Sequence, residues 1–135
     1  MRWYTDRPEY HRSTDYRKRY FRKHKGFTGI YCCPYCGKLL TEDTATVDHI
    51  IPVNAAKKSF LLRLLLRNTD DGINNMRNLT VACWKCNSKK SSKCGVWILR
   101  GKLGKFIFPI FWMMFFALFP YALSWGIAFI KVCFF

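Results

Sequence analysis

Two pairs of cysteines with identical spacing carry the clearest chemistry in this chain. Cys33 and Cys36 form one C-x-x-C pair, and Cys83 and Cys86 form a second pair after 46 intervening residues. A C-x-x-C turn presents both sulfurs to one ion, and four thiolates complete the tetrahedral shell of Zn²⁺. The spacing therefore predicts a closed, structural zinc site that joins two distant segments in place of a large core.

The other cysteines are not needed for this site. Cys32 is a rival first ligand, but its C-x-x-x-C spacing is less common, so we interpret Cys32, Cys94 and Cys133 as bystanders. The N-terminal sequence has no apolar stretch of the kind found in secretory signals, which favours reduced thiols. The odd total of 7 cysteines also fits metal ligation better than a disulfide framework.

A second group of polar residues accompanies the cysteines, and a structural zinc does not explain it. Asp48 and His49 are adjacent, and Asn87 directly follows the last cysteine of the motif. Asp and Asn supply the oxygen ligands that Mg²⁺ prefers, and a histidine can accept a proton from water near neutral pH. Neighbours on a strand point to opposite faces, so the pair shares a site only if the strand ends or bulges there, which Pro52 favours. The alternative is a purely structural Asp-His pair.

Taken in order, these motifs resemble the HNH endonucleases, a family with a ββα-metal core and a flanking four-cysteine zinc site. The family pattern runs C-x-x-C, D-H-I-x-P, N-L and C-x-x-C-N-x-x-K. The chain carries it as Cys33 to Cys36, Asp48 to Pro52, Asn78-Leu79 and Cys83 to Lys90. The resemblance covers about residues 30 to 93 and implies hydrolysis of phosphodiester bonds in DNA, with RNA as the other candidate substrate.

The resemblance also implies a role for each matching residue. His49 would be the general base, Asp48 and Asn87 would bind Mg²⁺ or another divalent cation, and Asn78 would orient the hairpin or the His49 ring. Such a cation stabilises the negative charge that builds up when a phosphodiester is attacked. The final family histidine is Asn87 here, and an amide oxygen can replace the imidazole as a ligand. A leucine-rich insert stands where many members have Gly-Gly.

Positioning these residues requires a small α+β domain, which we place at residues 30–94. The pattern predicts a short strand at 46–52, a second strand at 78–82 and a basic helix from Trp84 onward. The basic helix is expected to face the phosphate backbone, with a simply solvated face as the alternative. Its candidate nucleic-acid contacts are Lys85, Lys89, Lys90 and Lys93.

The insert between the two strands is predicted to be helical and buried. The segment at 55–68 is apolar nearly all round except for Arg63 and Arg67, so we expect it to be well buried. The run Asp70-Asp71-Gly72 predicts the turn that ends it.

The charge of the chain favours a polyanionic partner. The 23 Lys and Arg outnumber the 8 Asp and Glu and give a net charge of +15, which places nucleic acid ahead of an anionic membrane surface or an acidic protein. A composition of 50% hydrophobic and 18% aromatic residues excludes a purely disordered chain. Residues 1–29 are predicted to form a basic-aromatic arm for phosphate contacts and base stacking. The alternative is a charged surface helix whose aromatic side chains face the core.

The C-terminal segment is predicted to cross a membrane. Residues 106–130 carry no charge and exceed the roughly 20 residues that a spanning helix needs. Pro109 and Pro120 are tolerated in membrane spans, and a domain this small has no core to surround such a stretch.

The flanking charges predict the orientation of this segment. A basic juxtamembrane linker at 95–105 contains Arg100, Lys102 and Lys105, whereas only Lys131 follows the uncharged run. The positive-inside bias therefore predicts a single-pass protein with its N-terminal domain in the cytoplasm.

Two functions remain open at this point. The first is a metal-dependent endonuclease tethered to the membrane by its C-terminus, and the second is a zinc-stabilised nucleic-acid-binding module without cleavage activity. The joint presence of Asp48, His49 and Asn87 favours the endonuclease, because binding alone has no need of a base beside metal ligands.

Overall fold

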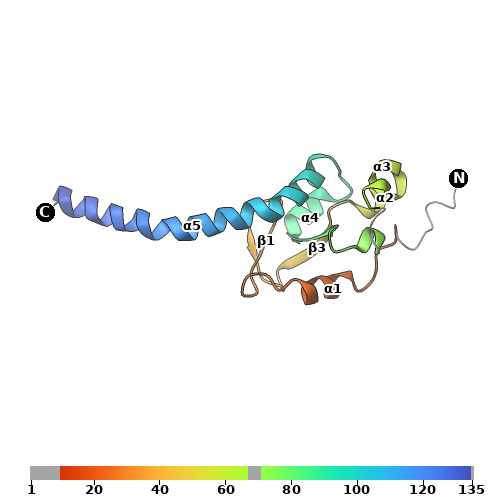
Figure 1. Cartoon of the computed structure of the whole chain (residues 1–135), viewed down its shortest axis with the longest axis horizontal. Coiled ribbons are helices and arrows are strands. Elements are labelled where there is room, and N and C mark those ends of the chain that lie inside the picture. Colours follow the sequence, from red (N-terminus) through yellow and green to blue (C-terminus); the bar gives the residue numbers. More distant parts are fainter. Residues whose placement is uncertain (1–9, 67–70, 135) are drawn as a thin grey trace.

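The computed structural model describes residues 10–66 and 71–134, and it divides them between a small α+β core and one long helix (Figure 1). In chain order the elements are α1 (Tyr16–Lys23), β1 (Tyr31–Cys32), β2 (Leu39–Leu40), β3 (Ala45–His49), α2 (Val53–Lys58), α3 (Phe60–Leu64), the 3₁₀ turn η2 (Gly72–Asn74), β4 (Leu79–Cys83), α4 (Trp84–Lys90) and α5 (Val96–Phe134). The first nine residues of the predicted N-terminal arm lie outside the described residues.

The centre of the core is the antiparallel pair of β3 and β4, with α4 following β4 directly. Asp48 stands opposite Thr80, and His49 stands opposite Leu79. Every residue of β4 is buried, in agreement with its apolar, β-branched sequence. β3 ends at His49 rather than at the predicted residue 52, because Pro52 cannot donate to a ladder and instead begins α2 as its N-cap.

A second antiparallel pair, β1 and β2, carries the first C-x-x-C turn. Tyr31 pairs with Leu40 and Cys32 pairs with Leu39. The turn is closed by the Gly37 amide, which donates to the Cys33 carbonyl oxygen at 2.8 Å. Gly37 adopts a φ of +76°, a left-handed conformation that favours glycine.

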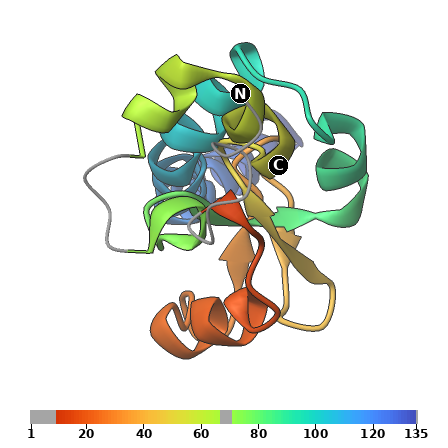
Figure 2. The ribbon, with the colours of Figure 1, turned by 90° about the vertical axis from the view of Figure 1, so that its right-hand side faces the viewer.

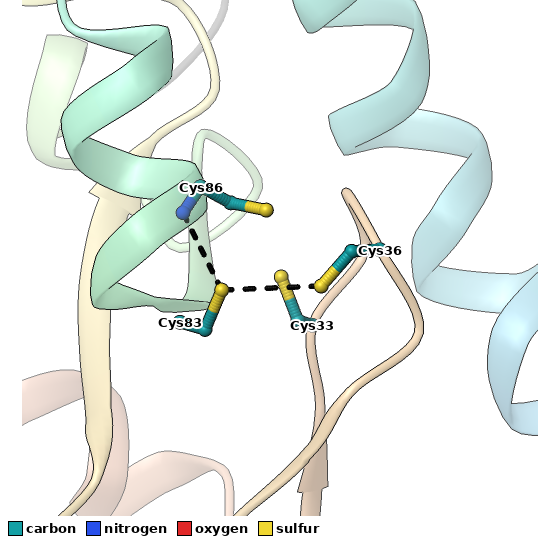
Figure 3. Close-up of side chains that lie close together, drawn as sticks. All are labelled: Cys33, Cys36, Cys83 and Cys86. Atoms are coloured by element: carbon teal, nitrogen blue, oxygen red, sulfur yellow. Dashed lines mark hydrogen bonds between the residues drawn. The ribbon is translucent and has the colours of Figure 1, made fainter.

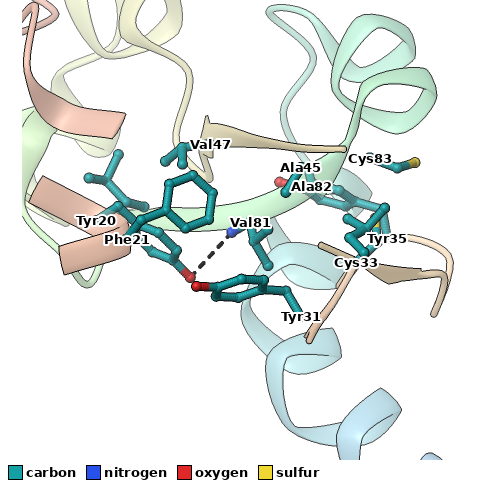
Figure 4. Packing of buried hydrophobic residues seen from close by; sticks show 12 residues of the cluster. Tyr20, Phe21, Tyr31, Cys33, Tyr35, Ala45, Val47, Val81, Ala82 and Cys83 are labelled. Atoms are coloured by element: carbon teal, nitrogen blue, oxygen red, sulfur yellow. Dashed lines mark hydrogen bonds between the residues drawn. The ribbon is translucent and has the colours of Figure 1, made fainter. Parts of the chain in front are cut away.

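Aromatic side chains of α1 form one wall of the main core (Figure 4). Phe21 meets Tyr20 and Tyr31 edge to face, with ring centroids 5.6 and 5.2 Å apart. The Val81 amide donates to the Tyr20 hydroxyl at 3.3 Å and so links α1 to β4. In its described part, the N-terminal segment therefore contains a charged surface helix whose aromatic residues Tyr20 and Phe21 face the core.

The leucine-rich insert differs from the single buried helix that its sequence predicts. It forms two short helices, α2 and α3, which meet at Ser59. The Ser59 hydroxyl accepts from the Leu62 amide at 3.4 Å and caps α3, so the serine starts a new helix instead of continuing the first. Phe60 and Leu61 are 64% and 71% exposed, so the expected burial is wrong for α3. Arg67, Asn68 and Asp70 lie outside the described residues.

The predicted basic linker at 95–105 is instead almost entirely the start of α5, and it packs on the core. Gly101 and Gly104 are buried, and a Cβ at Gly104 would lie 1.9 Å from the Pro34 carbonyl oxygen. Farther along, the Trp112 indole donates to the Gly37 carbonyl oxygen at 2.8 Å. The first turns of α5 therefore rest on the Cys33–Cys36 turn, and Figure 2 shows the core in front of the helix.

Beyond Trp112 the described side chains of α5, through Ser124, are all exposed. The 22 residues from 113 to 134 span about 33 Å at a rise of about 1.5 Å per residue. The Val96–Ser124 stretch reaches a mean hydropathy of 2.0 over an 18-residue window that is 0% buried. One C-terminal helix is thus long and apolar enough to cross a membrane, and Pro109 and Pro120 lie within it.

Candidate functional site

The four cysteines of the two C-x-x-C pairs converge on one point (Figure 3). Their sulfurs all lie within 4.8 Å of one another, and the Cys36 and Cys83 sulfurs are 3.9 Å apart. A tetrahedral site with Zn–S bonds of about 2.3 Å needs neighbouring sulfurs about 3.8 Å apart. The cluster is therefore positioned to bind a metal ion such as zinc, as the spacing predicts.

Local structure explains how each pair presents its sulfurs. Cys83 is the last residue of β4 and the N-cap of α4, and its sulfur accepts from the Cys86 amide at 3.4 Å. A spacing of three residues at a helix start places both side chains on one face. Cys32 points elsewhere, since its thiol donates to the Gly37 carbonyl oxygen at 3.4 Å. Among the described residues, neither Cys32 nor Cys94 joins the cluster, and the side chain of Cys133 is not described.

The thiols of the cluster differ in acidity. Burial raises the pKa of the Cys33 thiol to about 11 and also raises the pKa of Cys86, whereas hydrogen bonds from the other cysteines outweigh burial and lower the pKa of Cys83. Crowded, buried thiols do not ionise readily by themselves, whereas a bound zinc ion stabilises the thiolate form. Four sulfur ligands close to one another fit Zn²⁺ in their chemistry and in their geometry.

A cavity of about 560 Å³ brings together the other predicted site residues. Asp48 and His49 at the end of β3 and Asn87 on α4 all line it. β3 ends at His49, which is the condition under which two neighbouring side chains can share a site. Arg12, Lys57 and the start of α2 complete much of the wall.

His49 is fixed by a residue that the sequence did not single out. Its Nε2 lies 3.2 Å from the Oδ1 of Asn74, whose Nδ2 donates to the His11 carbonyl oxygen at 2.6 Å. With the amide oriented in this way, Nε2 carries the proton and Nδ1 is the acceptor. Nδ1 is buried and has no hydrogen-bond partner in the described part of the chain. Burial lowers the pKa of His49 below 6.5, so the ring is neutral near pH 7.

The Asp48 carboxylate already has two partners. The Tyr35 hydroxyl donates to it at 2.5 Å, and the Lys90 ammonium group lies 3.0 Å from its Oδ2. Lys90 also donates to the His49 carbonyl oxygen at 2.7 Å and so ties α4 to β3. Burial, followed by the charge of Asp48, raises the pKa of Tyr35, which keeps the phenol protonated as a donor.

The burial of Lys90 corrects one expectation about the basic helix. Its side chain is 0% exposed, so it does not face a phosphate backbone. It lies three residues after Asn87, on the face of α4 that packs toward β3. Lys85, Lys89 and Lys93 are exposed, as expected.

The two asparagines of the motif anchor backbone and side chains. Asn78 accepts from the Ile51 amide at 2.9 Å and donates to the Ile73 carbonyl oxygen at 2.8 Å. It therefore holds the loop after His49 against η2 and does not bond to the His49 ring. The Asn87 Nδ2 donates to the Thr46 hydroxyl at 3.0 Å, which fixes the rotation of the Asn87 amide.

No protein-family model, curated protein or solved structure matches this chain. The fold and the site define a small α+β protein with a four-cysteine cluster consistent with a zinc site. One long apolar helix at its C-terminus completes the description.

Proposed function

We propose that this chain is a metal-dependent endonuclease of the HNH type that hydrolyses DNA and is tethered to a membrane by α5. The observation that carries the proposal is the convergence of Asp48, His49 and Asn87 on one cavity beside the four-cysteine cluster. The order of β3, β4 and α4 also agrees with the strand, strand and helix that the resemblance implies.

The residues around this cavity fit a divalent cation. Asp48 and Asn87 would hold Mg²⁺ through carboxylate and amide oxygens, the ligand types that this ion prefers. When bound, the ion would stabilise negative charge on the phosphoryl group under attack. Tyr35 and Lys90 hold the Asp48 carboxylate in place for this role.

The protein itself contributes a proton acceptor, His49, for the attacking water. His49 takes the proton of the attacking water at Nδ1, the ring nitrogen that is buried without a partner. Its Nε2 keeps its own proton and donates it to the Asn74 Oδ1, which keeps the ring in one tautomer. Arg12 and Lys57 line the same cavity and supply positive charge for the phosphate group.

A second candidate function is a zinc-stabilised module that binds nucleic acid without cutting it. The ion pair between Lys90 and Asp48 favours this alternative, because Lys90 already neutralises the carboxylate. The two candidates share the zinc cluster and the exposed lysines of α4, and they differ in whether a phosphodiester bond is broken.

Cleavage of plasmid DNA by the full chain in detergent distinguishes the two functions. Supercoiled plasmid incubated with the zinc-loaded protein and Mg²⁺ should become nicked, and plasmid incubated with the same protein without Mg²⁺ should stay intact. Binding of plasmid without nicking, at any divalent cation tested, would favour the non-cleaving module. The full chain is the right material because residues up to Trp112 pack on the core.

A further inference from the structure

A second cavity, of about 540 Å³, lies between the end of α1 and the first turns of α5. It shares no lining residue with the cavity around His49. Three separate parts of the chain contribute cations to it, and none of its described lining residues is acidic. The residues that matter here are the basic Lys23, Arg77, Lys102 and Lys105 and the apolar Met76 and Phe106.

The charges around this cavity are not balanced by carboxylates of its own lining. Burial, and then the charges of Lys105 and Lys23, lower the pKa of the nearby His24. The Lys105 ammonium group donates to the Leu79 carbonyl oxygen. A cavity with several cations and an apolar floor is complementary to an anion that carries apolar chains.

The position of the cavity along α5 indicates where that anion comes from. Lys105 is the last cation before the uncharged run, and Phe106 is the first residue of that run. The turn between α1 and β1 lies on the side of the core from which α5 extends (Figure 1). On this turn Phe27 is 83% exposed and Ile30 is 44% exposed, with Lys25 beside them. Exposed apolar residues flanked by lysines are typical of surfaces that meet an anionic bilayer.

We propose that this cavity binds the phosphate headgroup of an anionic phospholipid. Lys23, Arg77 and Lys102 surround the phosphate, and Met76 and Phe106 contact the apolar part of the lipid. The inference rests on the membrane placement of α5 within the proposed function, and it is independent of DNA cleavage.

Native mass spectrometry of the full chain in mild detergent tests the proposal. Phosphatidylglycerol and phosphatidylcholine with the same acyl chains are titrated separately, and retained lipid is counted. We expect one phosphatidylglycerol to be retained roughly tenfold more strongly than phosphatidylcholine. Each cation near a membrane surface contributes roughly fivefold, so Arg77→Gln combined with Lys102→Gln should abolish the preference.

The matched control is Lys18→Gln combined with Lys58→Gln, which removes the same charge from two exposed lysines outside the cavity. This pair should retain phosphatidylglycerol as the unchanged chain does. An equal loss in both pairs would mean that diffuse charge, and not this cavity, holds the lipid. Displacement of the lipid by a short DNA duplex or by inorganic phosphate would likewise overturn a lipid-specific site.

A second measurement, insertion of the chain into vesicles, tests the membrane placement of α5 separately from the lipid site. A chain that stays outside vesicles and is released by high salt overturns both statements. A chain that inserts but retains the two lipids equally overturns the lipid site alone.

Discussion

His49 is the side chain on which the proposed chemistry depends, and its surroundings hold it tightly. Its ring is 1% exposed, packs against Tyr16 with centroids 5.0 Å apart, and bonds to Asn74. Because Nε2 bonds to Asn74 and Nδ1 has no hydrogen-bond partner among the described residues, Nδ1 is the atom that we propose takes the proton. A positioned general base contributes about 100- to 10,000-fold to a reaction rate.

We therefore expect His49→Ala to reduce plasmid nicking by at least about 100-fold while leaving zinc content unchanged, because His49 lies outside the four-cysteine cluster. Nicking assays and metal analysis of the purified variant measure the two properties. Ser88→Ala, an exposed position on α4 that does not line the cavity, is the control and should nick normally. Retention of most of the activity by His49→Ala would rule out its role as the base.

Lys90 gives a prediction about stability, because its removal leaves the buried Asp48 carboxylate without its cation. Breaking a buried ion pair from one side costs about 3–5 kcal/mol. Lys90→Met should lower the free energy of unfolding by about that amount in urea denaturation. Adding Asp48→Asn should recover much of the loss, since it removes the unpaired charge. Equal stability of Lys90→Met and the unchanged chain would contradict the ion pair.

Sequence reasoning could find part of this site and not the rest. Asp48, His49 and Asn87 are recognisable because their types and order match a motif. The inward direction of Lys90 depends on how α4 docks on β3, which a charge pattern cannot reveal. Asn74 comes from the insert, 25 residues after His49, and only the fold brings it to the ring.

At the scale of elements, the four-cysteine cluster joins the β1–β2 turn to the start of α4. A structural zinc supplies on the order of 10 kcal/mol to a domain of this size. Cys36→Ser should therefore leave the core unfolded or aggregated, as measured by circular dichroism and metal content. Cys32→Ser removes a neighbouring thiol outside the cluster and should fold with its zinc. Unfolding of both variants to the same extent would contradict the assignment of the ligands.

The contact between α5 and the first C-x-x-C turn depends on two glycines. At Gly104 a Cβ would lie 1.9 Å from the Pro34 carbonyl oxygen, whereas at Gly101 the nearest atoms are side-chain atoms of Ile50 and Tyr35 at 3.1 Å. Backbone cannot move aside as a side chain can, and overpacking costs about 1–3 kcal/mol. Gly104→Ala should therefore lower the Tm of the full chain more than Gly101→Ala does. A larger loss of Tm for Gly101→Ala than for Gly104→Ala would mean that α5 does not pack on the first C-x-x-C turn.

These glycines also explain why the sequence predicts a linker where the structure has the start of α5. Glycine and basic residues are typical of linkers, so the sequence of residues 95–105 predicts a basic juxtamembrane linker. In the structure the missing side chains at Gly101 and Gly104 allow the helix to approach the turn closely. The strands β3 and β4 were predictable because their apolar pattern is local, whereas the helix break at Ser59 depends on a competing side-chain bond.

At the scale of the whole molecule, the basic residues lie mostly before the apolar part of α5 along the chain. Arg100, Lys102 and Lys105 precede the apolar run, and Lys131 follows its uncharged part. We expect a reporter fused to the C-terminus to be active only outside the cytoplasm. The full chain should also remain in the membrane pellet after a high-salt wash, because salt screens surface charge without extracting a spanning helix. A silent reporter, or release by salt, would mean that α5 does not cross.

α5 continues from the core into its exposed half as one helix, from Val96 to Phe134. With a flexible linker of ten residues, the distance between an attached domain and the membrane could vary by roughly 15–20 Å. A helix that packs on the core fixes this distance. In a membrane, the cavity around His49 would therefore keep a nearly constant height above the bilayer. The proposed endonuclease would therefore act only on DNA that reaches the membrane surface.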